Sequence, residues 1–129
     1  MNRLSVKVEN IDKIDKLHIV TCKLGCQSIK AVSLELNESL KIGSNVELSV
    51  KSTNIALAKN FSGELSIINQ LTAKVTAIDK GALLSVVQVE FEGFSLECLL
   101  TVEATLSMGL SVGDDVTLLI KGSEVFVCG

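Results

Sequence analysis

The chain of 129 residues contains no proline, tryptophan or tyrosine, and its only aromatic residues are four phenylalanines. Proteins that bind nucleic acid normally carry a basic surface, often with aromatic rings that stack on the bases. The formal net charge is −3 and rings are scarce. We therefore predict no nucleic-acid partner, and we expect no DNA-binding helix-turn-helix ahead of Asn2.

Long apolar runs are missing as well. No stretch approaches the roughly 18 apolar residues that a membrane helix needs. Residues 1–7 carry charges where a signal peptide has its apolar stretch. We expect a soluble, cytoplasmic protein with no membrane partner.

Groups that serve catalysis are few. His18 is the only histidine, so no other histidine base can stand beside a nucleophile. A glycine-rich phosphate loop of the G-x-x-x-x-G-K type is absent. Asp114 and Asp115 precede Val116 in a turn, where aspartate is expected for turn reasons alone. We predict no enzyme activity, no catalytic residue and no organic cofactor.

The cysteines do not form a metal-binding pattern. They are four in number, and only Cys22 and Cys26 are close, with Gly25 between them. A structural zinc site needs four ligands, usually as two short-spaced pairs. We predict no metal site and expect reduced thiols that act as small apolar side chains. An opportunistic metal or redox role for Cys22 and Cys26 is the alternative.

The sequence is rich in valine, leucine, isoleucine, threonine and serine, a composition that favours strands. It also contains two copies of one pattern. Residues 2–13 and 69–80 are identical at seven of twelve positions, and residues 42–51 match 112–121 after a three-residue gap. Self-similarity of this kind indicates a duplication. We predict a first unit over residues 1–57, a connector over 58–65 and a second unit over 66–129.

Within each unit the pattern is that of short strands. Residues 4–8 alternate apolar and polar, which is the period of a half-buried strand. Residues 86–91 and 94–99 flank Glu92-Gly93 and predict a hairpin. One stretch per unit has helical spacing, residues 102–109 and a partner around Leu34 to Leu40.

For the second of these helical stretches, Thr101 is the expected N-cap and Gly109 the expected residue after the C-cap. Four or five short strands and one helical turn describe a small, partly open barrel. The predicted fold class is all-β, with two tandem OB-like small β-barrel units that each contain one short helical turn.

Hydroxyl groups and lysines gather at the strand ends of both units. A tetrahedral oxyanion needs N–H groups, hydroxyls and one or two cations as donors, and it needs neither metal ligands nor a base. Lys-(Ser/Gly)-(Thr/Ser) recurs at the same place in each unit, although solvated lysines and ordinary strand hydroxyls would give the same pattern. The candidates are Ser66, Thr101, Lys121 and Ser123 in the second unit, and Lys51, Ser52 and Thr53 in the first.

An ordered set of segments resembles the Mop domain, also called TOBE, which is the molybdate- and tungstate-binding module. The set is Ser66-Ile67-Ile68-Asn69-Gln70-Leu71, Lys74-Val75, Lys80-Gly81-Ala82, Leu100-Thr101, residues 108–116 and residues 120–125. The match is good over residues 66–127 and weaker over residues 2–57. The two-unit arrangement resembles a free-standing "dimop", or molbindin.

The resemblance implies oxyanion sites at interfaces between units, a closed homo-oligomer with a trimer favoured, and storage or homeostasis of molybdate or tungstate. A degenerate pair of units, acting only as an oligomerisation or regulatory interaction module, is the alternative. The implied oxyanion-binding residues are Ser66, Asn69, Thr101, Lys121, Gly122 and Ser123 in the second unit, and Lys51 and Ser52 in the first.

The sequence departs from the family pattern in two motifs. The family's Ser-Ala-Arg-Asn is kept at Ser66 and Asn69, but Ile67 replaces the alanine and Ile68 replaces the arginine. Its Thr-x-x-Ser keeps Thr101 but has Ala104 in place of the serine. Losing the arginine removes a charge-assisted donor that contributes about 1.5–3 kcal/mol, roughly one to two decades in affinity. We therefore predict weaker oxyanion binding than a complete motif gives.

Overall fold

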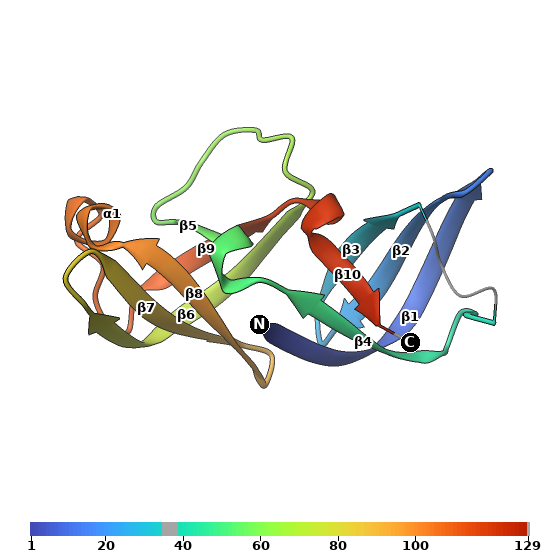
Figure 1. Cartoon of the computed structure of the whole chain (residues 1–129), viewed down its shortest axis with the longest axis horizontal. Coiled ribbons are helices and arrows are strands. Elements are labelled where there is room, and N and C mark those ends of the chain that lie inside the picture. Colours follow the sequence, from blue (N-terminus) through green and yellow to red (C-terminus); the bar gives the residue numbers. More distant parts are fainter. Residues whose placement is uncertain (35–38, 129) are drawn as a thin grey trace.

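The computed structural model describes residues 1–34 and 39–128, and its two curled sheets lie side by side along the long axis (Figure 1). The first half of the chain forms β1 (Asn2–Ile14), β2 (Leu17–Leu24), β3 (Gln27–Ser33), β4 (Asn45–Val50), the 3-10 turn η1 (Ser52–Asn54) and β5 (Ala56–Ala58). The second half forms β6 (Asn69–Lys80), β7 (Leu84–Phe91), β8 (Phe94–Thr101), α1 (Val102–Ser107), β9 (Asp115–Ile120), η2 (Gly122–Glu124) and β10 (Val125–Cys128).

Each sheet takes four strands from one half of the chain and its fifth strand from the other half. The strand orders are β10-β4-β1-β2-β3 and β5-β9-β6-β7-β8, with antiparallel neighbours throughout. The chain thus crosses between the sheets at η1 and again at η2 (Figure 1). Asn54 in η1 donates a hydrogen bond to Glu124 in η2 at 2.8 Å, so the two crossings are joined.

The two units repeat each other in backbone detail. β1 bulges just after Val8 and β6 bulges just after Val75, at equivalent places of the repeat. Gly43 and Gly113 donate N–H groups to the carbonyls of these two valines at 2.7 and 2.8 Å. Both glycines lie at positive φ, 91° and 95°, which residues with a side chain rarely adopt. This backbone conformation explains why both copies of the second repeated block have a glycine in the turn.

Alternation along the strands turns one face of each sheet inward. β1 and β6 both begin with strictly alternating buried and exposed residues. Leu48 and Leu118, equivalent residues of β4 and β9, have no exposed surface. The outer strands β10 and β3 of the first sheet also pack against each other, which curls the sheet. The predicted fold class, all-β with two tandem OB-like units, is confirmed.

The predicted helix and its caps are present in the second unit. The Thr101 hydroxyl accepts from the Ala104 N–H at 3.1 Å, and Gly109 follows the helix at a φ of 59°. Gly109 donates to the Leu106 carbonyl at 3.0 Å, and the next residue donates to the Thr105 carbonyl at 3.1 Å. This is a Schellman end. The helical stretch predicted over residues 34–40 falls mostly on residues 35–38, outside the described part of the chain.

The hairpin predicted around Glu92 is confirmed as the connection between β7 and β8. Glu92 and Gly93 lie at φ values of 50° and 82°, the two positive values of a type I′ turn. Among the described residues, no helix has the length and apolar character needed to cross a membrane.

Candidate functional site

A cavity of about 340 Å³ forms where both ends of the second unit meet strand β3 of the first. Its lining consists of the segment before β6, the crossing at η2 and one residue of β3: Ser66, Ile67, Ile68, Lys121, Gly122, Ser123 and Val32. The fold therefore brings together four of the predicted residues. Ser66 lies far in the sequence from the other three, which are the consecutive residues Lys121, Gly122 and Ser123.

Gly122 allows η2 to approach β3 closely. A Cβ atom on this residue would lie 2.8 Å from Val32 Cγ2 and 3.3 Å from Ile68 Cγ2. A separation of 2.8 Å between carbon atoms is well inside van der Waals contact. Gly122 thus shapes the cavity by having no side chain, and Ser52 is its half-buried counterpart in η1.

The polar side chains that line the cavity are available to bind a ligand. Lys121, Ser66 and Ser123 are exposed, and within residues 1–34 and 39–128 their side chains have no hydrogen-bond or ion-pair partner. Val32, Ile67 and Ile68 provide an aliphatic wall beside them. One cation and two hydroxyls at the rim of such a hollow are donors suited to an oxyanion.

Asn69 lies next to this cavity, but its side chain already has partners. Its Oδ1 accepts from the Lys30 N–H at 2.7 Å, and its Nδ2 donates to the Lys30 carbonyl at 2.9 Å. Asn69 is only 2% exposed. In this chain its amide therefore ties β6 of one unit to β3 of the other.

The remaining predicted residues lie elsewhere. Thr101 is not among the residues that line the cavity, and its hydroxyl caps α1. Lys51 and Ser52 stand at η1, which packs against β8 in the way that η2 packs against β3. Lys51 and Ser52 are therefore the first-unit counterparts of Lys121 and Gly122, beside β8.

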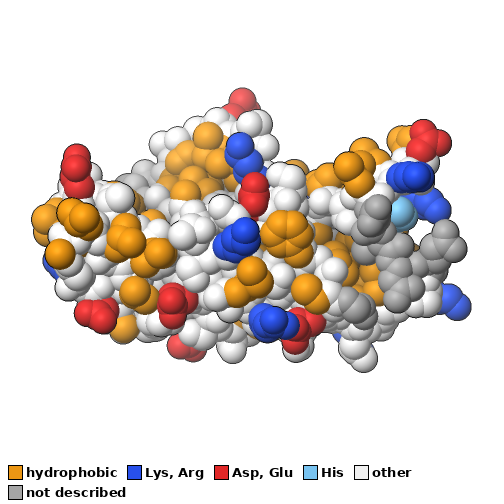
Figure 2. Space-filling model, in the orientation of Figure 1, with side chains coloured by type: hydrophobic (Ala, Val, Ile, Leu, Met, Phe, Trp, Pro, Cys, Tyr) orange, Lys and Arg blue, Asp and Glu red, His pale blue; other side chains and the backbone are white. Residues whose placement is uncertain are grey.

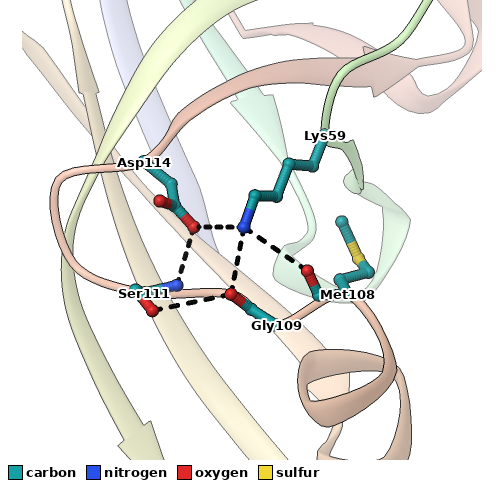
Figure 3. Close-up of polar contacts among 5 residues, drawn as sticks. All are labelled: Lys59, Met108, Gly109, Ser111 and Asp114. Atoms are coloured by element: carbon teal, nitrogen blue, oxygen red, sulfur yellow. Dashed lines mark hydrogen bonds and ion pairs between the residues drawn. The ribbon is translucent and has the colours of Figure 1, made fainter.

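Lys59, which the sequence patterns did not single out, anchors the end of strand β5 to the second unit through an ion pair and hydrogen bonds. Figure 3 shows Lys59, directly after β5, with its Nζ 3.0 Å from Asp114 Oδ2, 3.0 Å from the Gly109 carbonyl and 3.5 Å from the Met108 carbonyl. The two carbonyls belong to the end of the α1 segment, where a cation is favoured. Sequence patterns carry no signal for this role, because a single connector lysine is ordinary.

Asp114 in this cluster is held in its charged form. Its Oδ2 also accepts from the Ser111 N–H at 2.8 Å. This backbone hydrogen bond, and secondly the hydrogen bond from Lys59, lower the pKa of the Asp114 carboxyl below its ordinary value. The turn before β9 is thus fixed to the connector between the units.

The cysteines are divided between core and surface. Cys22 and Cys98 are buried, and desolvation raises the pKa of Cys22 to about 11 and that of Cys98 to about 12. Cys26 and Cys128 are exposed, and all four are free thiols. The buried thiols are poor nucleophiles at neutral pH. Within the described residues no group of three His, Cys, Asp or Glu side chains could hold a metal ion.

These features define a class: a tandem, strand-exchanged pair of OB-like units with a polar cavity between them. The TOBE domain profile matches residues 65–127. The chain belongs to the TOBE (Mop) domain family.

One solved structure matches the architecture over nearly the whole chain, and another matches about half of the chain. The chain is similar to the cytoplasmic molybdate-binding protein ModG, in a crystal form with molybdate bound, with a TM-score of 0.90 and 29% identity over 98% of this chain and 94% of that one. It is also similar to a molybdate-binding protein from Sporomusa ovata, with a TM-score of 0.51 and 30% identity over 52% of this chain and all of that one.

Curated relatives match only with part of their length. The molybdenum import ATP-binding protein ModC of Brucella abortus is 32% identical over 80% of this chain and 29% of its own length. The molybdenum transport protein ModE of Herbaspirillum seropedicae is 33% identical over 68% of this chain and 34% of its own length. The chain thus spans about a third of these curated relatives.

Proposed function

We propose that this protein is a non-enzymatic, cytoplasmic oxyanion-binding protein that stores or buffers molybdate or tungstate. The observation that carries the proposal is the cavity between the units, where Ser66, Lys121 and Ser123 present uncommitted donors. The ModG relative, described as cytoplasmic and crystallised with molybdate, supports the choice of ligand. Molybdate and tungstate are both tetrahedral dianions of nearly equal size, so the site accepts either.

Within the proposed site the roles differ by position. Lys121 supplies the charge, Ser66 and Ser123 donate hydroxyl hydrogen bonds, and Gly122 opens the space. Lys51 and Ser52 hold the corresponding place in the first unit. Asn69 supports the wall next to Ile68, and Thr101 acts through the fold of the α1 segment.

We further propose a closed homo-oligomer, with a trimer favoured. Large apolar side chains remain exposed at the outer ends of both units, for example Ile14 (75%) and Leu83 (81%). Figure 2 shows hydrophobic side chains at the surface over both sheets. Symmetric association is the usual way to cover such surfaces and open sheet edges.

A second candidate is a degenerate pair of units that only oligomerises or regulates a partner. Ile68 favours it, because it lines the cavity at the position where the resemblance places a cation. The engaged amide of Asn69 favours it too. The two candidates differ in a single measurable property, the binding of a tetrahedral oxyanion.

Titration calorimetry with molybdate and tungstate tests the proposal, with native mass spectrometry on the protein as purified. Lys121→Met keeps the aliphatic stem and removes the charge, so its affinity should fall about tenfold or more. Lys16→Met, at an exposed turn lysine, is the matched control and should bind like the parent. If the parent protein shows no binding heat in calorimetry and no bound anion in native mass spectrometry, the function is that of the interaction module.

A further inference from the structure

The two halves of the chain carry opposite charge, which the overall value of −3 conceals. Residues 1–57 contain eight lysines and arginines against six acidic residues, whereas residues 66–129 contain three against eight. On the face shown in Figure 2, acidic side chains are the more frequent over the second sheet and basic ones over the first. The molecule therefore has a basic end and an acidic end.

The asymmetry is sharpest in one row of residues across each sheet. In the first sheet Lys7 lies between its cross-strand partners Lys23 and Asn45; we call these three residues the basic row. In the second sheet the equivalent lysine lies between two acidic partners. This acidic row is Glu90, Lys74 and Asp115. All six side chains are exposed.

The basic row is unbalanced within its own chain. Like charges directly opposite on neighbouring strands repel, and neither Lys7 nor Lys23 has an ion-pair partner among the described residues. Both line a groove of about 670 Å³ on the outer face of the first sheet. The carboxylate in that groove, Glu47, already pairs with Arg3 at 2.6 Å.

The acidic row is unbalanced in the opposite sense. Lys74 lies 3.4 Å from Asp115, whereas Glu90, its other cross-strand partner, forms no ion pair within residues 1–34 and 39–128. An exposed aliphatic side chain lies close in sequence to one member of each row. Ile42, which is 67% exposed, comes three residues before Asn45 of the basic row, and Val112, which is 62% exposed, comes three residues before Asp115 of the acidic row. Each face thus offers uncompensated charge with apolar surface nearby, which are the components of a docking surface.

We infer that the basic row of one copy docks against the acidic row of the next copy of the same chain. A ring with threefold symmetry needs two different, mutually complementary faces on every subunit. The duplicated chain provides them, because the same structural position carries opposite charge in its two units. Closing the ring leaves neither row unpaired, and the charges set the register and direction of assembly.

Charge reversal tests this inference in anion-free buffer, so that the result is independent of oxyanion binding. Lys7→Glu with Lys23→Glu should raise the protein concentration for half-association at least about tenfold, as measured by sedimentation. Glu90→Lys with Asp115→Lys should do the same. The four changes combined restore complementarity and should return association to near the parent value. Lys13→Glu with Lys16→Glu, at the far turn of the first unit, is the matched control and should assemble like the parent.

The salt dependence of self-association in the parent protein is a second test of the inference. Raising the salt from about 0.01 M to about 1 M shortens the screening length from about 30 Å to about 3 Å, so association should weaken. A monomeric parent, unchanged sedimentation of both double variants, or a fourfold variant that fails to recover would each overturn the inference. It is also overturned if Lys7→Glu with Lys23→Glu assembles normally but loses molybdate binding, because the groove is then a small-anion site.

Discussion

The carboxamide of Asn69 and the main chain of Lys30 exchange two hydrogen bonds, of 2.7 and 2.9 Å, across the boundary between the units. The same double contact recurs between Asn2 and the main chain of Glu97, at 2.8 Å for both bonds. Lys30 and Glu97 lie on β3 and β8, the outer strands of the two sheets. The repeated asparagine thus satisfies backbone groups that an outer strand leaves unpaired.

Replacing Asn69 by aspartate should destabilise the protein by about 1–3 kcal/mol. The change keeps the shape but removes the Nδ2 donor, and it sets a carboxylate against the Lys30 carbonyl at a position that is 2% exposed. Urea unfolding at neutral pH measures the effect. Asn60→Asp, at an exposed connector residue, is the control and should leave the midpoint nearly unchanged. Equal midpoints for both variants would contradict an interface role for Asn69.

Replacing Gly122 by alanine should cost about 1–3 kcal/mol of stability through overpacking, because the new methyl group would lie 2.8 Å from Val32 Cγ2. The cavity is built on the same approach, so oxyanion affinity should fall as well. Val32→Ala removes the clashing methyl group, and the double variant should recover part of both losses. Thermal unfolding and calorimetry measure them. Additive losses in the double variant would show that the two residues do not meet.

Replacing Ile68 by arginine should strengthen oxyanion binding, because a planar guanidinium can donate two bonds to one oxyanion. Ile68 lines the cavity and is 55% exposed, so the backbone already directs this position to the site. Without ligand the added charge lies beside Lys121, and the melting temperature should fall. Molybdate should restore it by more than it raises that of the parent. An equal ligand-induced shift in the two proteins would place residue 68 outside the oxyanion contacts.

The contribution of Asp114 to stability should depend on pH. Its folded pKa is depressed, first by the Ser111 N–H and then by Lys59. The stabilisation is therefore present above the unfolded pKa of about 3.9 and is lost as the pH falls through the lower folded value. Urea unfolding of the parent and of Asp114→Asn should differ at about pH 7 and converge at about pH 2. Asp79→Asn, at an exposed strand residue, is the control substitution. Curves for the parent and Asp114→Asn that keep the same separation from about pH 7 to about pH 2 would contradict this role of Asp114.

The elements themselves could be predicted from local patterns. Alternation along residues 4–8 is a property of the strand period, and Thr101 and Gly109 mark the helix ends through their own side chains and backbone freedom. Duplication was visible as identity between residues 2–13 and 69–80. These signals are local because each depends on neighbours in the sequence.

The site could be predicted only in part. The hydroxyls and lysines at strand ends predict Ser66, Lys121 and Ser123, the resemblance to the family implies the same three residues, and the fold places them around one cavity. Val32 carried no signal, because an aliphatic residue in a strand is expected everywhere. The sequence shows that Asn69 recurs as Asn2 in the repeat, but it does not indicate that the Asn69 amide bonds to the main chain of Lys30, because the partner backbone groups carry no side-chain signal.

By itself, the sequence determined that this protein is a duplicated, strand-rich chain, because strand period, turn glycines and repeat identity are features of the order of residues. Its relation to the TOBE family rests on the resemblance of its ordered segments to that family, and the domain match over residues 65–127 shows it. Only the tertiary structure decided that β5 and β10 exchange between the sheets and that Lys59 fastens the crossing to Asp114. A strand of the right pattern can complete either of two homologous sheets. Which sheet it joins depends on the packing of η1 and η2 at the crossing, a contact between distant segments.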